Sequence, residues 1–192
     1  DEIMVEKKDP MDFVDKRLAE LKEKGVYRKL KIVVGEQLPV TNISGKEVIN
    51  LSSNNYLGLT THPKLREAAI EAIKKYGVGS GAVRTIIGTM EIHEELEKLL
   101  AEFKRTEATL VMQSGYCANI GCIGTLLEKG DLVISEELNH ASIIDAIRLT
   151  RAEKRIFPHK DVDALKAILE ETEGKYNKTL IVTDGVFSMD GD

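Results

Sequence analysis

Hydrophobic and polar residues form one pattern in residues 1–60 and a different pattern from residue 61 onward. Between residues 10 and 24, apolar side chains recur every three or four positions, which predicts an amphipathic helix ending near Gly25. The next segment consists of short apolar runs separated by Gly, Pro and Ser, which predicts short strands joined by turns. Residues 1–60 are therefore expected to form an N-terminal helix and strand segment.

From residue 61 onward, helical and strand patterns alternate. The pattern predicts helices at 62–77, 90–104, 116–128, 141–150 and 161–172, and strands at 108–112, 131–135, 154–157 and 179–183. A repeated strand–helix–strand order is typical of a mostly parallel sheet covered by helices. Residues 61–192 are expected to be the first part of a large domain of the α/β class.

Polar residues directly follow three of the predicted strands, after Met112, Ser135 and Thr183. Because parallel sheets bind ligands outside the carboxyl ends of their strands, these are candidate binding positions. The first of them, Ser114-Gly115, leads into a helix whose free backbone N–H groups could bind a phosphate. The same junction is also typical of an ordinary turn, and the residues alone leave both possibilities open.

His140 and Ser188 occupy the second and third positions. His140 stands between a strand end and a helix start, where an imidazole can stack on a ligand or hydrogen-bond to it. Its neighbours Asn139 and Ser142 could each cap the helix that follows. Ser188 lies in a polar loop, which could equally be a turn capped locally by Asp184.

Composition and charge exclude several classes of function. The 192 residues are 42% hydrophobic and carry a net charge of −5 without a basic block, which disfavours nucleic-acid binding. The sequence has neither an apolar stretch of membrane-spanning length nor a signal-peptide pattern in residues 1–30, so a cytoplasmic protein is expected. Cys117 and Cys122 point to different faces of one predicted helix, which predicts free, buried thiols. The four histidines lack metal-ligand spacing, so no metal site is predicted.

Seven sequence blocks resemble the α-oxoamine synthase family, in the family's order and at its spacing. They are "SSNNYLGL", "HPKL", "GSGAVRTIIGT", "HEELE", "SGYCAN", "LNHASIIDAIRL" and "TDGVFSMDGD". The resemblance implies the aspartate-aminotransferase-like fold (fold type I of the PLP-dependent transferases) and a pyridoxal 5'-phosphate (PLP) cofactor. It also implies condensation of an amino acid with an acyl-CoA, release of CoA, and a homodimer.

The same resemblance suggests cofactor-binding residues. Gly115 and Tyr116 match the positions that hold the PLP phosphate, and Asn119 matches a residue that supports this turn. His140 matches the histidine that stacks on the PLP ring and also meets the substrate. Ser188 matches the serine close to the phenolic oxygen of the cofactor.

Substrate contacts are implied for Asn54, which matches an asparagine near the carboxylate of the amino acid, and for Arg28, which matches a basic residue near the acyl-CoA entrance. None of the lysines stands in the Gly-Lys-Ala-type context of the family's Schiff-base lysine, and the aspartate that binds the ring nitrogen is also unmatched. We therefore expect a segment of a longer enzyme that is inactive by itself, with the rest of the large domain and a small C-terminal domain elsewhere.

The resemblance divides between two branches of the family. "RTIIGTMEIHEELE" and "LNHASIIDAIRL" look like 2-amino-3-ketobutyrate CoA ligase (glycine C-acetyltransferase), so glycine and acetyl-CoA are the favoured substrates. At Gly115-Tyr116, where the ligase usually has Cys-Phe, the sequence looks like 8-amino-7-oxononanoate synthase, which uses alanine and a pimeloyl thioester. This synthase is the alternative, together with a catalytically incomplete PLP-fold binding or scaffold fragment.

Overall fold

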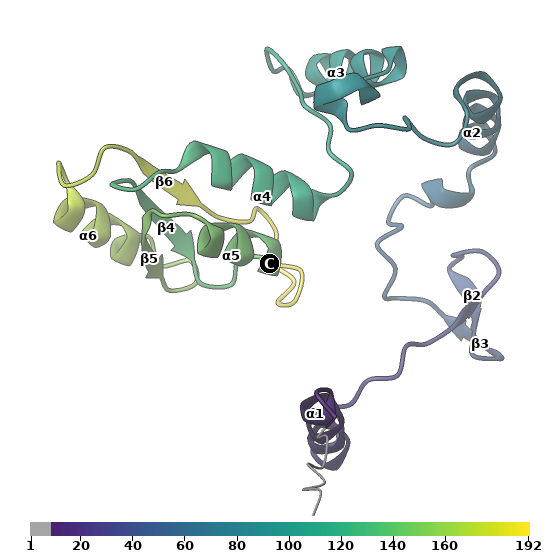
Figure 1. Cartoon of the computed structure of the whole chain (residues 1–192), viewed down its shortest axis with the longest axis horizontal. Coiled ribbons are helices and arrows are strands. Elements are labelled where there is room, and N and C mark those ends of the chain that lie inside the picture. Colours follow the sequence, from purple (N-terminus) through teal and green to yellow (C-terminus); the bar gives the residue numbers. More distant parts are fainter. Residues whose placement is uncertain (1–8) are drawn as a thin grey trace, which may run out of the picture. The chain divides into compact units, whose positions relative to one another are not determined.

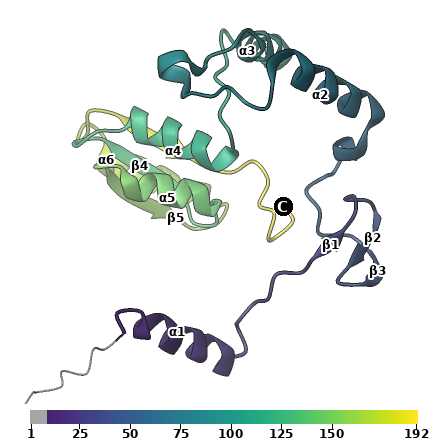
Figure 2. The same ribbon diagram turned by 45° about the vertical axis from the view of Figure 1, so that its right-hand side comes forward.

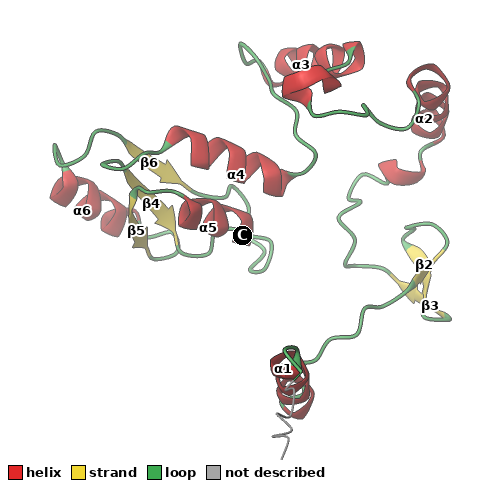
Figure 3. Cartoon of the chain, viewed as in Figure 1, coloured by secondary structure: helices red, strands yellow, loops and turns green. Residues whose placement is uncertain are grey.

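The computed structural model describes residues 9–192, which divide into two compact units between Gly81 and Ala82 (Figures 1 and 3). This division rests on contacts within the chain, and the sequence-based division between residues 60 and 61 stays a prediction about the domains of the complete protein. Within the described range, no helix is both long enough and apolar enough to cross a lipid bilayer.

The first unit contains two helices and a small antiparallel sheet. Its elements are α1 (Asp12–Glu23), β1 (Val33–Val34), β2 (Val40–Ile43), β3 (Lys46–Ile49), the 3₁₀ turn η1 (Leu59–Thr61) and α2 (Pro63–Tyr76). The sheet order is β1-β2-β3 (Figure 2). Ser44 and Gly45 connect β2 to β3 and both have positive φ, 52° and 86°, a conformation that suits tight hairpin turns. The predicted helices and strands of this unit are confirmed.

The second unit carries a parallel sheet. Its elements are the π-helical turn η2 (Arg84–Gly88), α3 (Glu91–Lys104), α4 (Gly115–Leu126), β4 (Leu132–Glu136), α5 (Ala141–Leu149), β5 (Glu153–Phe157), α6 (Val162–Thr172) and β6 (Thr179–Val182). β4 lies between β5 and β6 and is parallel to both. Leu132 on β4 is paired with Glu153 on β5 and with Thr179 on β6. This arrangement confirms the predicted α/β class.

β4 is the centre of the core, and all five of its residues are buried. Because side chains alternate along a strand, Val133 faces one side of the sheet and Leu132 and Ile134 face the other. Val133 packs against α4 and α5, whereas Leu132 and Ile134 pack with Phe157 against α6. Complete burial of an aliphatic side chain of this size contributes about 1.5–3 kcal/mol, so the two apolar layers fix the sheet between its helices.

The predicted strand at 108–112 is wrong, because this segment has no strand partner among the described residues. Its backbone groups are instead hydrogen-bonded by side chains. The N–H of Val111 donates to Glu97 Oε1 (2.7 Å), and the Val111 carbonyl accepts from Arg84 Nη1 (3.2 Å). Arg84 and Glu97 also form a two-point ion pair, with Nη1 2.5 Å from Oε1 and Nη2 3.1 Å from Oε2. We call these three residues the Val111 clamp.

The two cysteines are free, as predicted, but the expectation that both are buried is wrong. Cys117 is half-buried and Cys122 is exposed on α4. The reason is that Ile120 and Ile123 occupy the core-facing side of α4, which leaves the cysteine positions outside the packed layer.

The Val111 clamp predicts a pH-dependent local stability. The hydrogen bond from Arg84, followed by that from the Val111 N–H, lowers the pKa of Glu97 to about 2 from its ordinary value of 4.5. A carboxylate whose pKa is lower in the folded state stabilises that state above its unfolded pKa, and the contribution is lost as the pH falls through the folded pKa. Glu97→Gln should therefore speed amide hydrogen exchange of residues 108–112 at neutral pH, and the difference from wild type should shrink between pH 4.5 and about 2.

Hydrogen–deuterium exchange of the complete protein, followed by mass spectrometry, measures this effect. Glu95→Gln is the matched control, because Glu95 is exposed on the same helix. Equal exchange of 108–112 in wild type and Glu97→Gln at neutral pH would contradict the role of the clamp.

Candidate functional site

A pocket of about 600 Å³ lies at the carboxyl ends of β4 and β6. Its lining comes from three segments: the first turns of α4, the start of α5, and the loop after β6. Of the residues predicted from sequence, it gathers Gly115, Tyr116, Asn119, His140 and Ser188. The parallel strands β4 and β6 end at one edge and bring the start of α5 and the loop after β6 together. The first turns of α4 line the same pocket although no strand precedes them in the described chain.

The start of α4 offers unpaired backbone donors to this pocket. Ser114 caps the helix, with its Oγ accepting a hydrogen bond from the Cys117 N–H (3.2 Å). Within residues 9–192, no partner is recorded for the N–H groups of Gly115 and Tyr116, which belong to the first helical turn. A Cβ atom built on Gly115 would meet no other atom within 4 Å. Open space beside free donors at a helix N-terminus fits an anionic group such as a phosphate.

The hydroxyl of Tyr116 contacts a carboxylate on α5. The phenol oxygen lies 3.3 Å from Asp145 Oδ2 on α5, and the negative charge of Asp145 raises the pKa of Tyr116 above its ordinary value. Asp145 is in turn paired with Arg148 at 3.0 Å. The hydroxyl is thus engaged within the chain, and Tyr116 contributes to the pocket through its ring and its backbone N–H.

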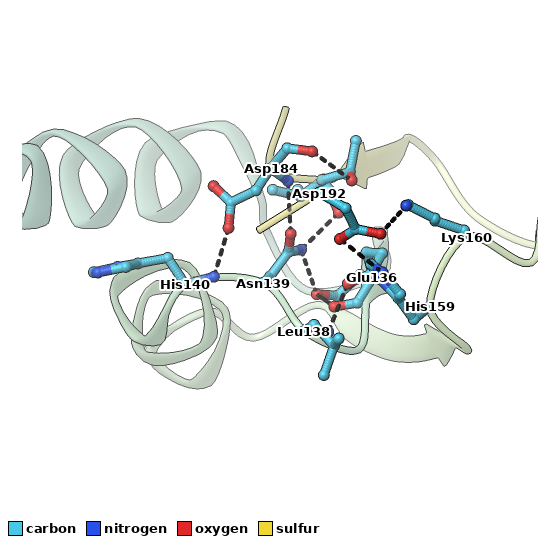
Figure 4. A network of polar contacts seen from close by, with 11 residues as sticks. Glu136, Leu138, Asn139, His140, His159, Lys160, Asp184 and Asp192 are labelled. Carbon is cyan, nitrogen blue, oxygen red and sulfur yellow. Dashed lines mark hydrogen bonds and ion pairs between the residues drawn. The ribbon is translucent and has the colours of Figure 1, made fainter. Parts of the chain in front are cut away.

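Asn139 joins the ends of the two strands that carry the pocket. Its side chain is 4% exposed. Nδ2 donates to Ser135 Oγ (3.0 Å) and to the carbonyl of Val182 (2.8 Å), while Oδ1 accepts from the N–H of Asp184 (2.7 Å) (Figure 4). The amide therefore satisfies polar groups at the ends of β4 and β6 at the same time.

His140 is held at both its backbone and its ring. Its backbone N–H donates to Asp184 Oδ2 (2.6 Å), and its ring extends away from Asn139 (Figure 4). Nδ1 accepts from the N–H of Ser142 (3.1 Å), so His140 itself is the N-cap of α5. The prediction that Asn139 or Ser142 caps this helix is wrong, since the Asn139 amide is used between the strands.

A second polar network, missed by the sequence analysis, anchors the loop that carries Ser188. Buried Glu136, at the end of β4, lies 2.5 Å from His159 Nδ1, and the His159 ring contacts Phe187 edge-on with centroids 4.7 Å apart. The N–H of Phe187 donates to the Asp192 carbonyl (2.6 Å), and the Asp192 carboxylate pairs with Lys160 (Figure 4). A charged residue at the end of the apolar run "DLVISE" was the one sequence signal for this network.

Asn54 and Arg28 belong to the first unit, whereas the residues that line the pocket belong to the second. Both are exposed residues of the first unit, so their predicted substrate contacts stay predictions. No cluster of three His, Cys, Asp or Glu side chains that could hold a metal ion occurs in the described part of the chain.

A parallel sheet with a pocket at its carboxyl edge is compatible with a PLP-dependent transferase, and comparison with known families shows this family. Residues 46–192 match the family described as aminotransferase class I and II. The chain belongs to this family and, within it, to the α-oxoamine synthases, of which it represents an N-terminal half.

Two curated relatives are identical to the chain at more than half of the aligned positions. The 8-amino-7-oxononanoate synthase of Thermoanaerobacter pseudethanolicus is 60% identical over 182 residues, which are 95% of this chain and 46% of the relative. The synthase of Alkaliphilus metalliredigens is 58% identical with the same coverage. The chain thus spans about half the length of the curated relatives it matches.

Solved structures give the same family. Serine palmitoyltransferase from S. paucimobilis, with a bound PLP–myriocin aldimine, has a TM-score of 0.86 and 34% identity over 96% of this chain and 48% of its own. The 8-amino-7-oxononanoate synthase of Francisella tularensis has a TM-score of 0.60 and 29% identity, covering 73% of this chain and 38% of its own.

These relatives bear on the choice between the two branches. The favoured interpretation, glycine and acetyl-CoA, gains no support from them, since the curated relatives above are named 8-amino-7-oxononanoate synthase. The alternative, indicated by Gly115-Tyr116, fits them better.

The position of Asn139 predicts a large effect on stability. Asn139→Ala removes three hydrogen bonds and leaves the Asp184 N–H without its recorded partner. An unsatisfied buried polar group costs about 1–3 kcal/mol, so the free energy of unfolding should fall by at least that amount. Urea denaturation of the complete protein, monitored by circular dichroism, measures it.

Asn177→Ala is the control for this substitution, because Asn177 is an exposed asparagine of the same unit. An Asn139→Ala variant as stable as Asn177→Ala would show that the amide does not hold the strand ends.

Proposed function

We propose that the complete protein is an 8-amino-7-oxononanoate synthase, an acyltransferase that uses PLP to join alanine to a pimeloyl thioester, with release of CoA and loss of the alanine carboxyl group as carbon dioxide. The observation that carries this proposal is the 60% identity to a curated synthase over 95% of the chain. The Gly115-Tyr116 pair at the start of α4 supports the same branch.

The pocket fits PLP by the chemistry of its donors. The free N–H groups of Gly115 and Tyr116 would receive the phosphate, and the open space beside Gly115 would let it approach the backbone. When bound, PLP supplies an electron-withdrawing ring that stabilises negative charge at the α-carbon of the amino acid. Ser188 lines the same pocket and is the proposed neighbour of the phenolic oxygen.

His140 would orient the reacting groups. Its ring is exposed to the pocket, while its backbone is fixed by Asp184 and its Nδ1 by the start of α5. A flat side chain held in this way can support a bound ring and limit its rotation, which lowers the entropic cost of reaching the reactive geometry.

The remaining assignments concern the complete protein. We infer that Asn54 meets the amino-acid carboxylate and that Arg28 lies near the acyl-CoA entrance, in a cytoplasmic homodimer. Activity is proposed for the complete protein and not for this segment, because the sequence contains no lysine in the context of the family's Schiff-base lysine.

Substrate preference tests the proposal. The complete protein should show visible absorption when loaded with PLP and should release CoA faster from alanine with pimeloyl-CoA than from glycine with acetyl-CoA. A thiol-reactive dye follows CoA, and mass spectrometry identifies the product. If PLP-loaded protein released no CoA with either pair of substrates, the acyltransferase assignment would be refuted. A preference for glycine with acetyl-CoA would instead favour the glycine C-acetyltransferase branch.

Substitution of His140 tests the site. His140→Ala should lower kcat/KM by about a hundredfold, the size of effect expected when a reacting group is misplaced, while the protein stays folded. His62→Ala, which changes an exposed histidine of the first unit, is the matched control. Wild-type turnover in His140→Ala would remove this residue from the site.

A further inference from the structure

We propose that Asn119 and Ser142 are positioning residues that keep the His140 proton on Nε2, so that His140 presents a hydrogen-bond donor to the pocket. The three side chains form a continuous series from α4 to α5. Asn119 Nδ2 donates to Ser142 Oγ (2.8 Å), and Ser142 Oγ lies 2.7 Å from His140 Nδ1.

The backbone of Ser142 favours an unprotonated Nδ1. Its N–H lies 3.1 Å from Nδ1 with hydrogen-bond geometry. A backbone N–H can only donate, so this contact is satisfied only when Nδ1 accepts and carries no proton. In the neutral imidazole the proton is then on Nε2.

The hydroxyl of Ser142 supports the same state. Ser142 is 1% exposed, so water cannot take the place of a protein partner. Its oxygen already accepts from the Asn119 amide, and the nearest acceptor recorded for its proton is Nδ1. The amide therefore sets the direction of the hydroxyl, and the hydroxyl donates to the ring.

This arrangement leaves one ring nitrogen for a ligand. Nδ1 is occupied by Ser142, and the backbone N–H of His140 is occupied by Asp184. Nε2 has no recorded partner among residues 9–192 and belongs to a pocket-lining side chain. Nε2 of His140 can therefore donate a hydrogen bond to an acceptor atom of a group bound in the pocket. That this neighbour is PLP or its substrate rests on the proposed function, whereas the proton position does not.

Nuclear magnetic resonance of the complete protein, labelled with ¹⁵N-histidine and freed of PLP, tests the assignment. Two-bond ¹H–¹⁵N correlation spectra separate protonated from unprotonated ring nitrogens, and His140→Gln identifies the signals. At a pH well above the ordinary histidine range, Nδ1 should show the shift of an unprotonated nitrogen and Nε2 that of a protonated one. A protonated Nδ1 in the wild-type protein would overturn the proposal.

Two variants test the positioning residues. Asn119→Asp keeps the shape of the side chain but replaces the donor with an acceptor. The hydroxyl of Ser142 should then donate to the new carboxylate and accept from Nδ1, so the Nδ1 signal should move to the protonated range. Ser142→Ala removes only the hydroxyl and should move the signal part of the way.

Thr125→Ala is the control, because it removes an exposed hydroxyl of α4 that bonds only the helix backbone at Gly121. Backbone amide spectra establish that each variant is folded, and Ser142→Ala decides the matter if Asn119→Asp does not fold. Wild-type Nδ1 signals in the folded variants would refute the role of Asn119 and Ser142. Because the spectra are recorded on protein without PLP or substrate, their outcome does not depend on whether the protein is active in the synthase assay.

Discussion

One buried amide, that of Asn139, holds together the edge of the sheet on which the candidate site depends. Strands that run side by side tend to separate where their ladder of hydrogen bonds ends, because the last carbonyl and N–H groups lose their partners. Asn139 supplies partners to the ends of β4 and β6 together. The two loops that leave these strands therefore start from one fixed point, and His140 and Asp184 face each other across it.

Apolar packing stabilises the sheet, whereas polar interactions orient the groups at its edge. Helices pack on both faces of the middle of β4. Because the hydrophobic effect is non-directional, this packing does not orient polar groups. Hydrogen bonds at the strand ends orient these groups. Glu136 fixes the ring of His159, and Asn139 fixes the backbone at Asp184. A rigid apolar platform with directional bonds at one edge is what a site of defined geometry needs.

Local pattern was enough to predict the helices and most strands, because periodicity reports which side of an element is buried. It failed at 108–112, since a strand is defined by its neighbour and the peptide groups of Val111 are bound by side chains of Arg84 and Glu97 instead. It also failed at the cap of α5, where His140 takes the position for which Asn139 has the better intrinsic preference. The contact between Glu136 and His159 spans 23 residues, and no local pattern encodes such a pair. The pocket itself was foreseeable, because parallel topology dictates where strand ends meet.

The first unit differs from the second in how little it buries. Between residues 9 and 81 the only buried side chain is that of Thr41, and neither α1 nor α2 buries any. Helices of 12 and 14 residues are only marginally stable by themselves in water. The order of folding follows from this contrast. The sheet around β4 is stabilised by contacts within its own unit, whereas residues 9–81 gain little stability from burial and can become ordered later, once their apolar side chains are covered.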